Sequence, residues 1–250
     1  MNLSVIIITK NAGTMIQRCL ESVAWADETI VVDSGSTDST LEICQKMGVR
    51  LTINTDWPGF GVQKNRALDL ATGDWVLSID ADEWVTPELR AEILAIIDDH
   101  AAVHAYAIPR RSSFCGRFMK HSGWWPDYVV RLFQRNSARF SDDQVHERLI
   151  VTGTTRKLKQ PLLHETVSDM DQMLSKMNMY SSASAGMLHA NGRRASIGTA
   201  LLHGGWAFFR TYVLRRGFLD GREGFLLAVV NAEGSYYRYI KLMLQQDKPR

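Results

Sequence analysis

The chain has 250 residues, 22% of them charged, and a formal net charge of +2. This length allows a sizeable hydrophobic core, in one large domain or in a domain with an appendage. The nearly balanced charge argues against disorder and against a nucleic-acid partner. The three cysteines lack CxxC spacing, which favours a reducing compartment over a disulfide framework or a zinc site.

The N-terminal apolar run, residues 5–8, is too short for a signal peptide, and no basic region precedes it. No stretch has 18 uninterrupted apolar residues, as a membrane-spanning helix would need. We therefore expect a cytoplasmic protein.

Apolar runs typical of buried strands alternate with helical periodicity over the first hundred residues. Strands are predicted at 3–8, 28–32, 50–53 and 75–79. Helices are predicted at 15–23, 37–47 and 62–71, and from the Thr86-Pro87 pair onward, where threonine and proline are typical of a helix start. This alternation predicts an α/β fold with a mostly parallel sheet and helices on both faces.

The pattern changes after residue 100. Further strands are predicted at 104–110, 128–133 and 146–151, and a helix at 167–189. From residue 191 the chain combines apolar and aromatic residues with arginines. We therefore predict a catalytic domain at 1–190, with halves at 1–100 and 101–190, and a helical extension at 191–250.

Three polar segments follow three of the predicted strands: TKN at 9–11, DSGSTDS at 33–39 and DADE at 80–83. Ligands of open α/β sheets bind outside the carboxyl ends of the strands. The first loop lacks the GxGxxG of dinucleotide sites, and no P-loop sequence occurs. Both large nucleotide-binding classes are therefore disfavoured.

Asp80 and Asp82 are two positions apart at the end of a strand, so both side chains can face one site. Carboxylate oxygens with open coordination positions suit Mg²⁺ or Mn²⁺ completed by phosphate oxygens. The alternative is that Asp82 and Glu83 only favour the start of the helix at Pro87.

These motifs resemble a known family. SVIIITKN, IVVDSGSTDST, GFGVQKNRAL and LSIDADEW, in this order, resemble family 2 glycosyltransferases of the GT-A fold. RLFQR, VHERL, LLHETV and the glycine-rich tail resemble the subgroup that extends lipopolysaccharide inner cores, which includes the heptose β-1,4-glucosyltransferases.

The resemblance implies that Thr9, Asn11 and Asp33 hold the uridine half of a UDP-sugar. Asp80 and Asp82 would then handle ribose, diphosphate and the metal ion, Mg²⁺ or Mn²⁺. Many relatives carry two acids where this chain has Asp33-Ser34, which leaves the contacts to base and ribose open. The alternative for Asp33 is a purely structural role in a turn.

Lys64 and Arg66 are expected near the diphosphate, at the start of a helix that favours anions. The alternative is a solvated basic helix face.

Inversion at an anomeric carbon needs a base for the acceptor hydroxyl. Glu147 is the first candidate, because relatives often place acids there, and Asp143 is the second. The alternative for Glu147 is an ordinary salt bridge with Arg148 or Arg131.

Trp124 and Trp125 could stack on a sugar or lie in a core. The tail between residues 193 and 222 carries six arginines among apolar residues, which suits a helix in a membrane interface. The alternative is a helical cover over the catalytic domain or a dimer interface.

The expected function is transfer of a hexose, glucose by this resemblance, from a UDP-sugar such as UDP-glucose to a core heptose. The acceptor would be lipid-linked and the enzyme peripheral on the cytoplasmic face of the inner membrane. Alternatives are a polyprenyl phosphate or surface polysaccharide acceptor, or a non-catalytic scaffold that binds sugar nucleotides.

Overall fold

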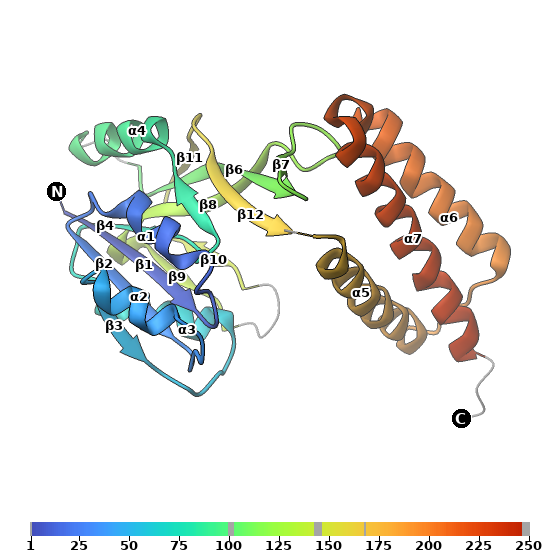
Figure 1. Cartoon of the computed structure of the whole chain (residues 1–250), viewed down its shortest axis with the longest axis horizontal. Helices are drawn as coiled ribbons and strands as arrows, with labels where there is room; N and C mark the ends of the chain where they lie inside the picture. Colours follow the sequence, from blue (N-terminus) through green and yellow to red (C-terminus); the bar gives the residue numbers. More distant parts are fainter. Residues whose placement is uncertain (1, 100–102, 143–146, 168, 247–250) are drawn as a thin grey trace. The chain divides into compact units, whose positions relative to one another are not determined.

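The computed structural model of the protein describes residues 2–99, 103–142, 147–167 and 169–246 (Figure 1). Its helices are α1 (Ile16–Val23), α2 (Thr40–Lys46), α3 (Phe60–Leu70), α4 (Pro87–Asp98), α5 (Met170–Ala190), α6 (Ile197–Phe209) and α7 (Gly221–Gln246), with short turns η1 (Arg135–Ser137), η2 (Arg210–Leu214) and η3 (Gly217–Asp220). Its strands are β1 (Leu3–Thr9), β2 (Glu28–Asp33), β3 (Arg50–Ile53), β4 (Trp75–Ser78), β5 (Glu83–Val85), β6 (Ala105–Phe114), β7 (Arg117–Phe118), β8 (Asp127–Gln134), β9 (Ala138–Phe140), β10 (Leu149–Val151), β11 (Thr155–Lys157) and β12 (Leu162–Val167).

The chain divides into two compact units. The first contains residues 1–110 and 127–164, and the second contains residues 111–126 and 165–250. The domain boundary predicted at residue 190 falls at the end of α5, inside the second unit, and stays a prediction.

The predicted parallel half of the sheet is confirmed, in the order β3-β2-β1-β4. Alternate residues of β1 enter two hydrophobic clusters, because its side chains point to opposite faces. Val5 and Ile7 pack with residues of α1 and α4, whereas Ile6 packs with residues of α3. Helices therefore cover both faces, as the alternation of strands and helices predicted.

Antiparallel pairings extend this sheet. Strand β8 pairs with both β4 and β6, and β12 pairs with β5. Leu132 of β8 is opposite Leu77 of β4. The neighbouring Arg131 is thereby placed beside the acidic segment that follows β4.

Helix α4 begins where the Thr86-Pro87 pair predicts. Thr86 is the N-cap and its side chain accepts a hydrogen bond from the backbone N–H of Leu89 at 3.2 Å. Pro87 occupies the first turn of the helix, where backbone N–H groups have no partner within the helix, so proline costs no hydrogen bond there. Leu89 and Ile93 are fully buried, so the cap fixes which face of the helix meets the core.

In the second unit α5, α6 and α7 lie side by side (Figure 1). Helices α6 and α7 pack closely at Gly204 of α6. A Cβ added at this position would lie only 3.3 Å from the carbonyl oxygen of Ala232 in α7. His203 of α6 stacks on Tyr239 of α7, with ring centroids 4.2 Å apart. The predicted helix at 167–189 is confirmed as α5.

One buried carboxylate fastens the loop 111–126 to these helices. Asp220 is 1% exposed and ends η3. It accepts hydrogen bonds from the backbone N–H groups of Lys120 and His121, both at 3.0 Å, and from the Ser122 hydroxyl at 2.9 Å. The loop therefore depends on Asp220 for three of its polar contacts.

We expect Asp220→Ala to lower the free energy of unfolding by about 2–3 kcal/mol, because three donors lose a charged acceptor. Urea denaturation of the full chain measures this. Asp171→Ala, which removes an exposed acid from the first turn of α5, is the matched control and should cost much less. Equal losses in both variants would contradict the anchoring role.

Candidate active site

The polar loops after β1 and β2 are tied to each other. The register pairs Thr9 with Asp33, so the two strands end level. The Asn11 amide oxygen accepts from the backbone N–H of Thr37 at 2.8 Å, and the Asn11 N–H donates to the Ser36 hydroxyl at 2.8 Å. Asn11 has a φ of 52°, a left-handed conformation that asparagine tolerates better than most residues. The predicted cluster of polar loops at this edge is therefore confirmed.

Asp33 is fully buried and shapes the loop that follows it. Its carboxylate accepts from the N–H groups of Gly35 and Ser36 at 2.8 and 2.7 Å, and from the Ser36 hydroxyl. The structural alternative for Asp33 is thus observed, and a role at the nucleotide stays a prediction. Beside it, the buried Thr9 hydroxyl has no hydrogen-bond partner among the described residues.

Helix α3 carries Lys64 into the site because its first turn packs closely on another segment. A Cβ on Gly61 would overlap the carbonyl oxygen of Ser141, so only glycine allows this approach. Asn65 then pairs with the backbone of Phe140 in both directions, at 2.9 and 3.0 Å. These contacts explain the glycine and asparagine of GFGVQKN, and they fix the side of α3 from which Lys64 extends.

Lys64 joins two acids. Its ammonium nitrogen lies 3.1 Å from Asp80 Oδ1 and 3.1 Å from Glu147 Oε1, and its side chain is only 7% exposed. Two predicted site residues from distant parts of the chain are thereby brought together. Glu147 forms a salt bridge, as its structural alternative predicted, but the partner is Lys64, whereas Arg131 pairs elsewhere.

Arg131 neutralises the acids at the end of β4. Its Nη2 lies 2.5 Å from Asp80 Oδ2 and 2.7 Å from Glu83 Oε1. Burial alone would raise the pKa of Asp80, but the charges of Arg131 and Lys64 outweigh burial and hold this pKa well below its ordinary value. Burial raises the pKa of Glu83, and Arg131 offsets only part of that effect. Asp80 is therefore the more firmly ionised of the two.

Asp82 has a different environment from the other two acids. Its side chain is 36% exposed, close to the 33% of Asp80, and its Oδ2 lies 3.3 Å from Nε2 of His164, with no lysine or arginine as a partner among the described residues. The oxygens of Asp80, in contrast, are each engaged by a cation. An accessible carboxylate oxygen beside an imidazole nitrogen fits a divalent ion such as Mn²⁺. The donor atoms at Asp82 are thus of the right type for such an ion, and both Asp82 and Asp80 as metal ligands stay predictions.

Two other predicted residues are not part of this cluster. Arg66 forms its ion pair with Asp56, at 2.7 Å, and not with the acids after β4. Asp143, the second candidate base, lies outside the described residues. Within the described ranges, no group of three or more His, Cys, Asp or Glu side chains could hold a metal ion.

The profile of Glycosyl transferase family 2 matches residues 4–164, which include the whole of this cluster. The chain belongs to this family. An uncharacterized glycosyltransferase of Rickettsia conorii is 31% identical over 252 residues, which cover 96% of this chain and 89% of that protein. The lipopolysaccharide core biosynthesis glycosyltransferase LpsC of Rhizobium meliloti is 29% identical over 259 residues, which cover 96% of this chain and 91% of that protein.

The fold agrees with this assignment. A crystal structure of S. aureus TarS in complex with UDP superposes on this glycosyltransferase with a TM-score of 0.52, at 18% identity. The superposition covers 99% of this chain and 92% of that chain. The predicted GT-A type of α/β fold is thus confirmed.

Sequence reasoning named Arg131 only as a possible partner of Glu147, and it did not assign His164 to the site of this glycosyltransferase. A signal for Arg131 existed, since a charged residue in the apolar strand YVVRLF needs a buried carboxylate partner. His164 is 82 positions away from Asp82, and only the pairing of β12 with β5 brings the two together.

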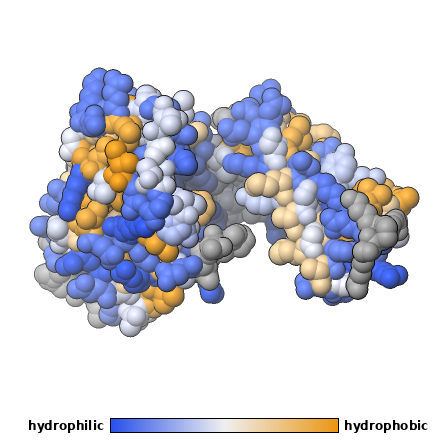
Figure 2. Space-filling model, turned by 90° about the horizontal axis from the view of Figure 1, so that it is seen from below, coloured by the Kyte–Doolittle hydropathy of each residue, from blue (hydrophilic) through white to orange (hydrophobic). Residues whose placement is uncertain are grey.

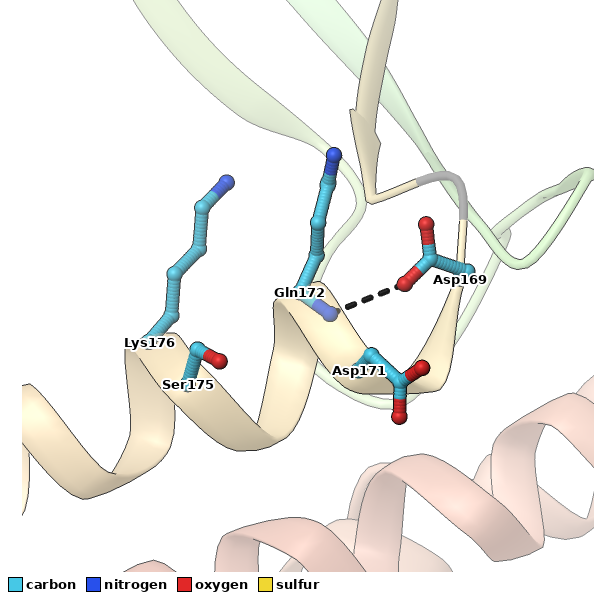
Figure 3. A pocket seen from close by; sticks show the side chains of 5 residues that line it. All are labelled: Asp169, Asp171, Gln172, Ser175 and Lys176. Carbon is cyan, nitrogen blue, oxygen red and sulfur yellow. Dashed lines mark hydrogen bonds between the residues drawn. The ribbon is translucent and has the colours of Figure 1, made fainter.

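Trp124 and one pocket belong to the second unit of the glycosyltransferase. Trp124 packs edge-on against Phe114 in a small core, which supports the structural alternative for this residue. A pocket of about 690 Å³ opens beside the start of α5, where Gln172 and Lys176 extend to the same side of the helix (Figure 3). None of the predicted site residues lines this pocket.

In the described part of the chain, no helix is both long enough and apolar enough to cross a membrane.

We expect Arg131→Met to lower the free energy of unfolding by about 3–5 kcal/mol at pH 7, because two carboxylates lose their buried cation. The pKa of Asp80 is lowered in the folded protein, so its contribution is present above its unfolded pKa of about 3.9 and is lost as the pH falls below it. The difference between wild type and variant should therefore narrow below about pH 4.

Urea denaturation at several pH values measures this difference. Arg139→Met, which removes an exposed pair with Asp69, is the control and should have a much smaller effect. If the difference in free energy of unfolding between wild type and Arg131→Met stays constant with pH, the electrostatic explanation is refuted.

Proposed function

We propose that this enzyme is an inverting glycosyltransferase that moves a hexose, glucose being the expected one, from a UDP-sugar to a heptose of the lipopolysaccharide inner core. The observation that carries the proposal is the arrangement around Lys64, which places a buried cation between Asp80 and Glu147, with the accessible carboxylate of Asp82 on the same segment as Asp80. The family assignment and the likeness to LpsC support both the reaction and the acceptor class.

In this proposal the loops after β1 and β2 receive the uridine. Thr9 offers a buried hydroxyl whose hydrogen-bonding capacity is unused among the described residues, and Asn11 and Asp33 hold the two loops in place. TarS, which has a similar fold, has a crystal structure in complex with UDP, the nucleotide part of this donor class. The cation of Lys64 would attract the diphosphate.

A bound Mg²⁺ or Mn²⁺ would stabilise the negative charge that develops on the departing diphosphate. Asp82, with His164 beside it, would hold the ion, and the same carboxylate would orient the diphosphate. Asp80 stays ionised through Arg131 and Lys64 and so maintains the charge balance of the site.

Glu147 is proposed as the base. Its carboxylate would accept the proton of the acceptor hydroxyl while the new bond forms between that oxygen and the anomeric carbon. The bond from the anomeric carbon to the diphosphate oxygen breaks at the same time, and its electron pair leaves with UDP. Lys64, 3.1 Å from Glu147, would orient this carboxylate before the acceptor arrives.

The acceptor class also suggests where the enzyme works. A heptose of a growing lipopolysaccharide is attached to lipid, so the proposed acceptor lies at a membrane surface. We therefore propose a peripheral protein on the cytoplasmic face of the inner membrane.

Thermal shifts with UDP, GDP, CDP and TDP, each with and without Mn²⁺, test the donor site, because ligands that bind the folded state raise the melting temperature. We expect a shift selective for UDP and enhanced by Mn²⁺. In Asp82→Ala the metal enhancement should disappear and transfer should fall about a hundredfold or more. The melting temperature without ligand should stay unchanged, because Asp82 is partly exposed.

Asp98→Ala, at the exposed end of α4, is the matched control and should behave like wild type. The donor assignment fails if no nucleotide shifts the melting temperature, a result that would favour a scaffold without donor chemistry. Near-normal transfer by Asp82→Ala would sink the metal assignment.

Glu147→Gln keeps the size of the side chain and removes its charge. If Glu147 is the base, transfer should fall about 10²- to 10⁴-fold while the UDP-dependent thermal shift persists. Transfer to a truncated lipopolysaccharide core, measured as UDP release, reports the loss. If Glu147 only pairs with Lys64, the variant would lose thermal stability but keep activity within a few-fold of wild type.

A further inference from the structure

Helix α6 has two contrasting faces. Small residues, Ala200, Gly204 and Ala207, are buried on one face. The other face carries large apolar side chains that are exposed to solvent, with Leu202 74% and Trp206 52% exposed. Ile197, Leu201 and Phe209 are also exposed there at helical spacing. Within the part of the chain that the structure describes, the more hydrophobic face of α6 is therefore exposed.

The exposed apolar surface continues beyond the helix. Phe208 of α6 contacts Phe225 of α7, with ring centroids 5.8 Å apart, and Tyr212 contacts both Phe225 and Phe218. Further exposed apolar residues of this stretch are Val213, Leu214, Leu219 and Leu226. We call the exposed residues of 193–226 the tail surface. Figure 2 shows hydrophobic residues (orange) at the surface of this unit beside hydrophilic ones (blue).

The charges of the tail surface have one sign. Its arginines are all exposed: Arg193, Arg194, Arg210, Arg215, Arg216 and Arg222. The two acids in residues 193–226 are buried and so are not part of this surface: Asp220 is 1% exposed and Glu223 6%. Asp220 is engaged by the loop 111–126, and Glu223 accepts from Arg222 and lies 3.7 Å from Arg117. No carboxylate of residues 191–231 is therefore exposed.

This combination suits one kind of partner. Exposed leucine, phenylalanine and tryptophan beside arginines match the boundary of acyl chains and anionic headgroups. With 13 residues, α6 is about 20 Å long, shorter than the roughly 30 Å hydrocarbon core, and the π turn η2 interrupts its geometry. A helix of this kind lies along a membrane surface.

We propose that the tail surface binds an anionic phospholipid bilayer, with α6 in the plane of the interface, its apolar face in the acyl boundary and its arginines on phosphate groups. This inference deepens the proposed membrane location by assigning the surface and the lipid class. It rests on the proposed function only for its biological purpose, since binding to lipid requires neither donor nor acceptor.

Flotation of the full chain with vesicles of phosphatidylcholine alone, or mixed with phosphatidylglycerol, tests the proposal. We expect binding to the anionic vesicles that weakens as salt is added. Leu202→Glu combined with Trp206→Glu should weaken vesicle binding at least about tenfold, because two apolar side chains of the tail surface become charged. Both side chains are exposed, so we expect the fold to stay intact. Leu94→Glu, an exposed leucine of α4 in the first unit, is the matched control and should bind like wild type.

The arginines are tested separately. Replacing Arg193, Arg194 and Arg210 by glutamine should cost up to about fivefold in binding per residue on anionic vesicles and reduce the salt dependence. Binding to phosphatidylcholine alone should not change.

Failure to bind any vesicle, or equal binding by wild type and the Leu202/Trp206 variant, would overturn the proposal. So would a wild-type dimer that the variant converts to monomer while vesicle binding is unaffected, because the surface would then join two copies of the chain. The UDP thermal shift is an independent readout. Its persistence in these variants separates a failure of the lipid inference from a failure of the proposed transferase function.

Discussion

The contact of Arg131 with Asp80 and Glu83 is the interaction on which the site depends. Three acids within four residues repel one another, and burial makes the repulsion more costly. A single buried guanidinium that reaches both Asp80 and Glu83 offsets part of that cost, and Lys64 adds to this offset at Asp80. Because Arg131 comes from β8, the acidic segment can keep its conformation only when the antiparallel half of the sheet is in place.

The same contact divides the work among the three acids. Glu83 begins β5 and has a structural role, because its buried carboxylate pairs with Arg131 and Arg110. Asp80 forms ion pairs with both Arg131 of β8 and Lys64 of α3, and so links the sheet to the helix that carries Lys64. Asp82 has neither cation as a partner, and this leaves its oxygens accessible to a ligand. The segment thus pairs Asp80 and Glu83 with cations and leaves Asp82, within the described ranges, with an imidazole neighbour only.

The parallel half of the fold was predictable because its signals are local. Strand runs, helical spacing and the Thr86-Pro87 cap each lie within a few residues, and the polar loops follow from where parallel strands end. Their meeting at one edge was therefore predictable as well. The ion pairs were not, because Lys64–Glu147 and Arg131–Asp80 join segments 83 and 51 positions apart. A sequence pattern can predict which type of residue occupies such a site. The ion-pair partner of that residue depends on how distant strands and helices pack together.

Arginine has two opposite roles in this chain, and the position of the carboxylates decides which one applies. In the first unit the acids after β4 are close enough to Arg131 to compensate its burial, so the cation is part of the interior. In the second unit Asp220 and Glu223 are turned inward and are satisfied by backbone N–H groups and by local arginines. The arginines of the tail surface consequently keep a positive charge that no exposed acid balances. Water solvates these arginines, so their charge is no obstacle to folding. Their positive charge beside the exposed apolar side chains of α6 is the feature that would attract the phosphate headgroups of the proposed membrane.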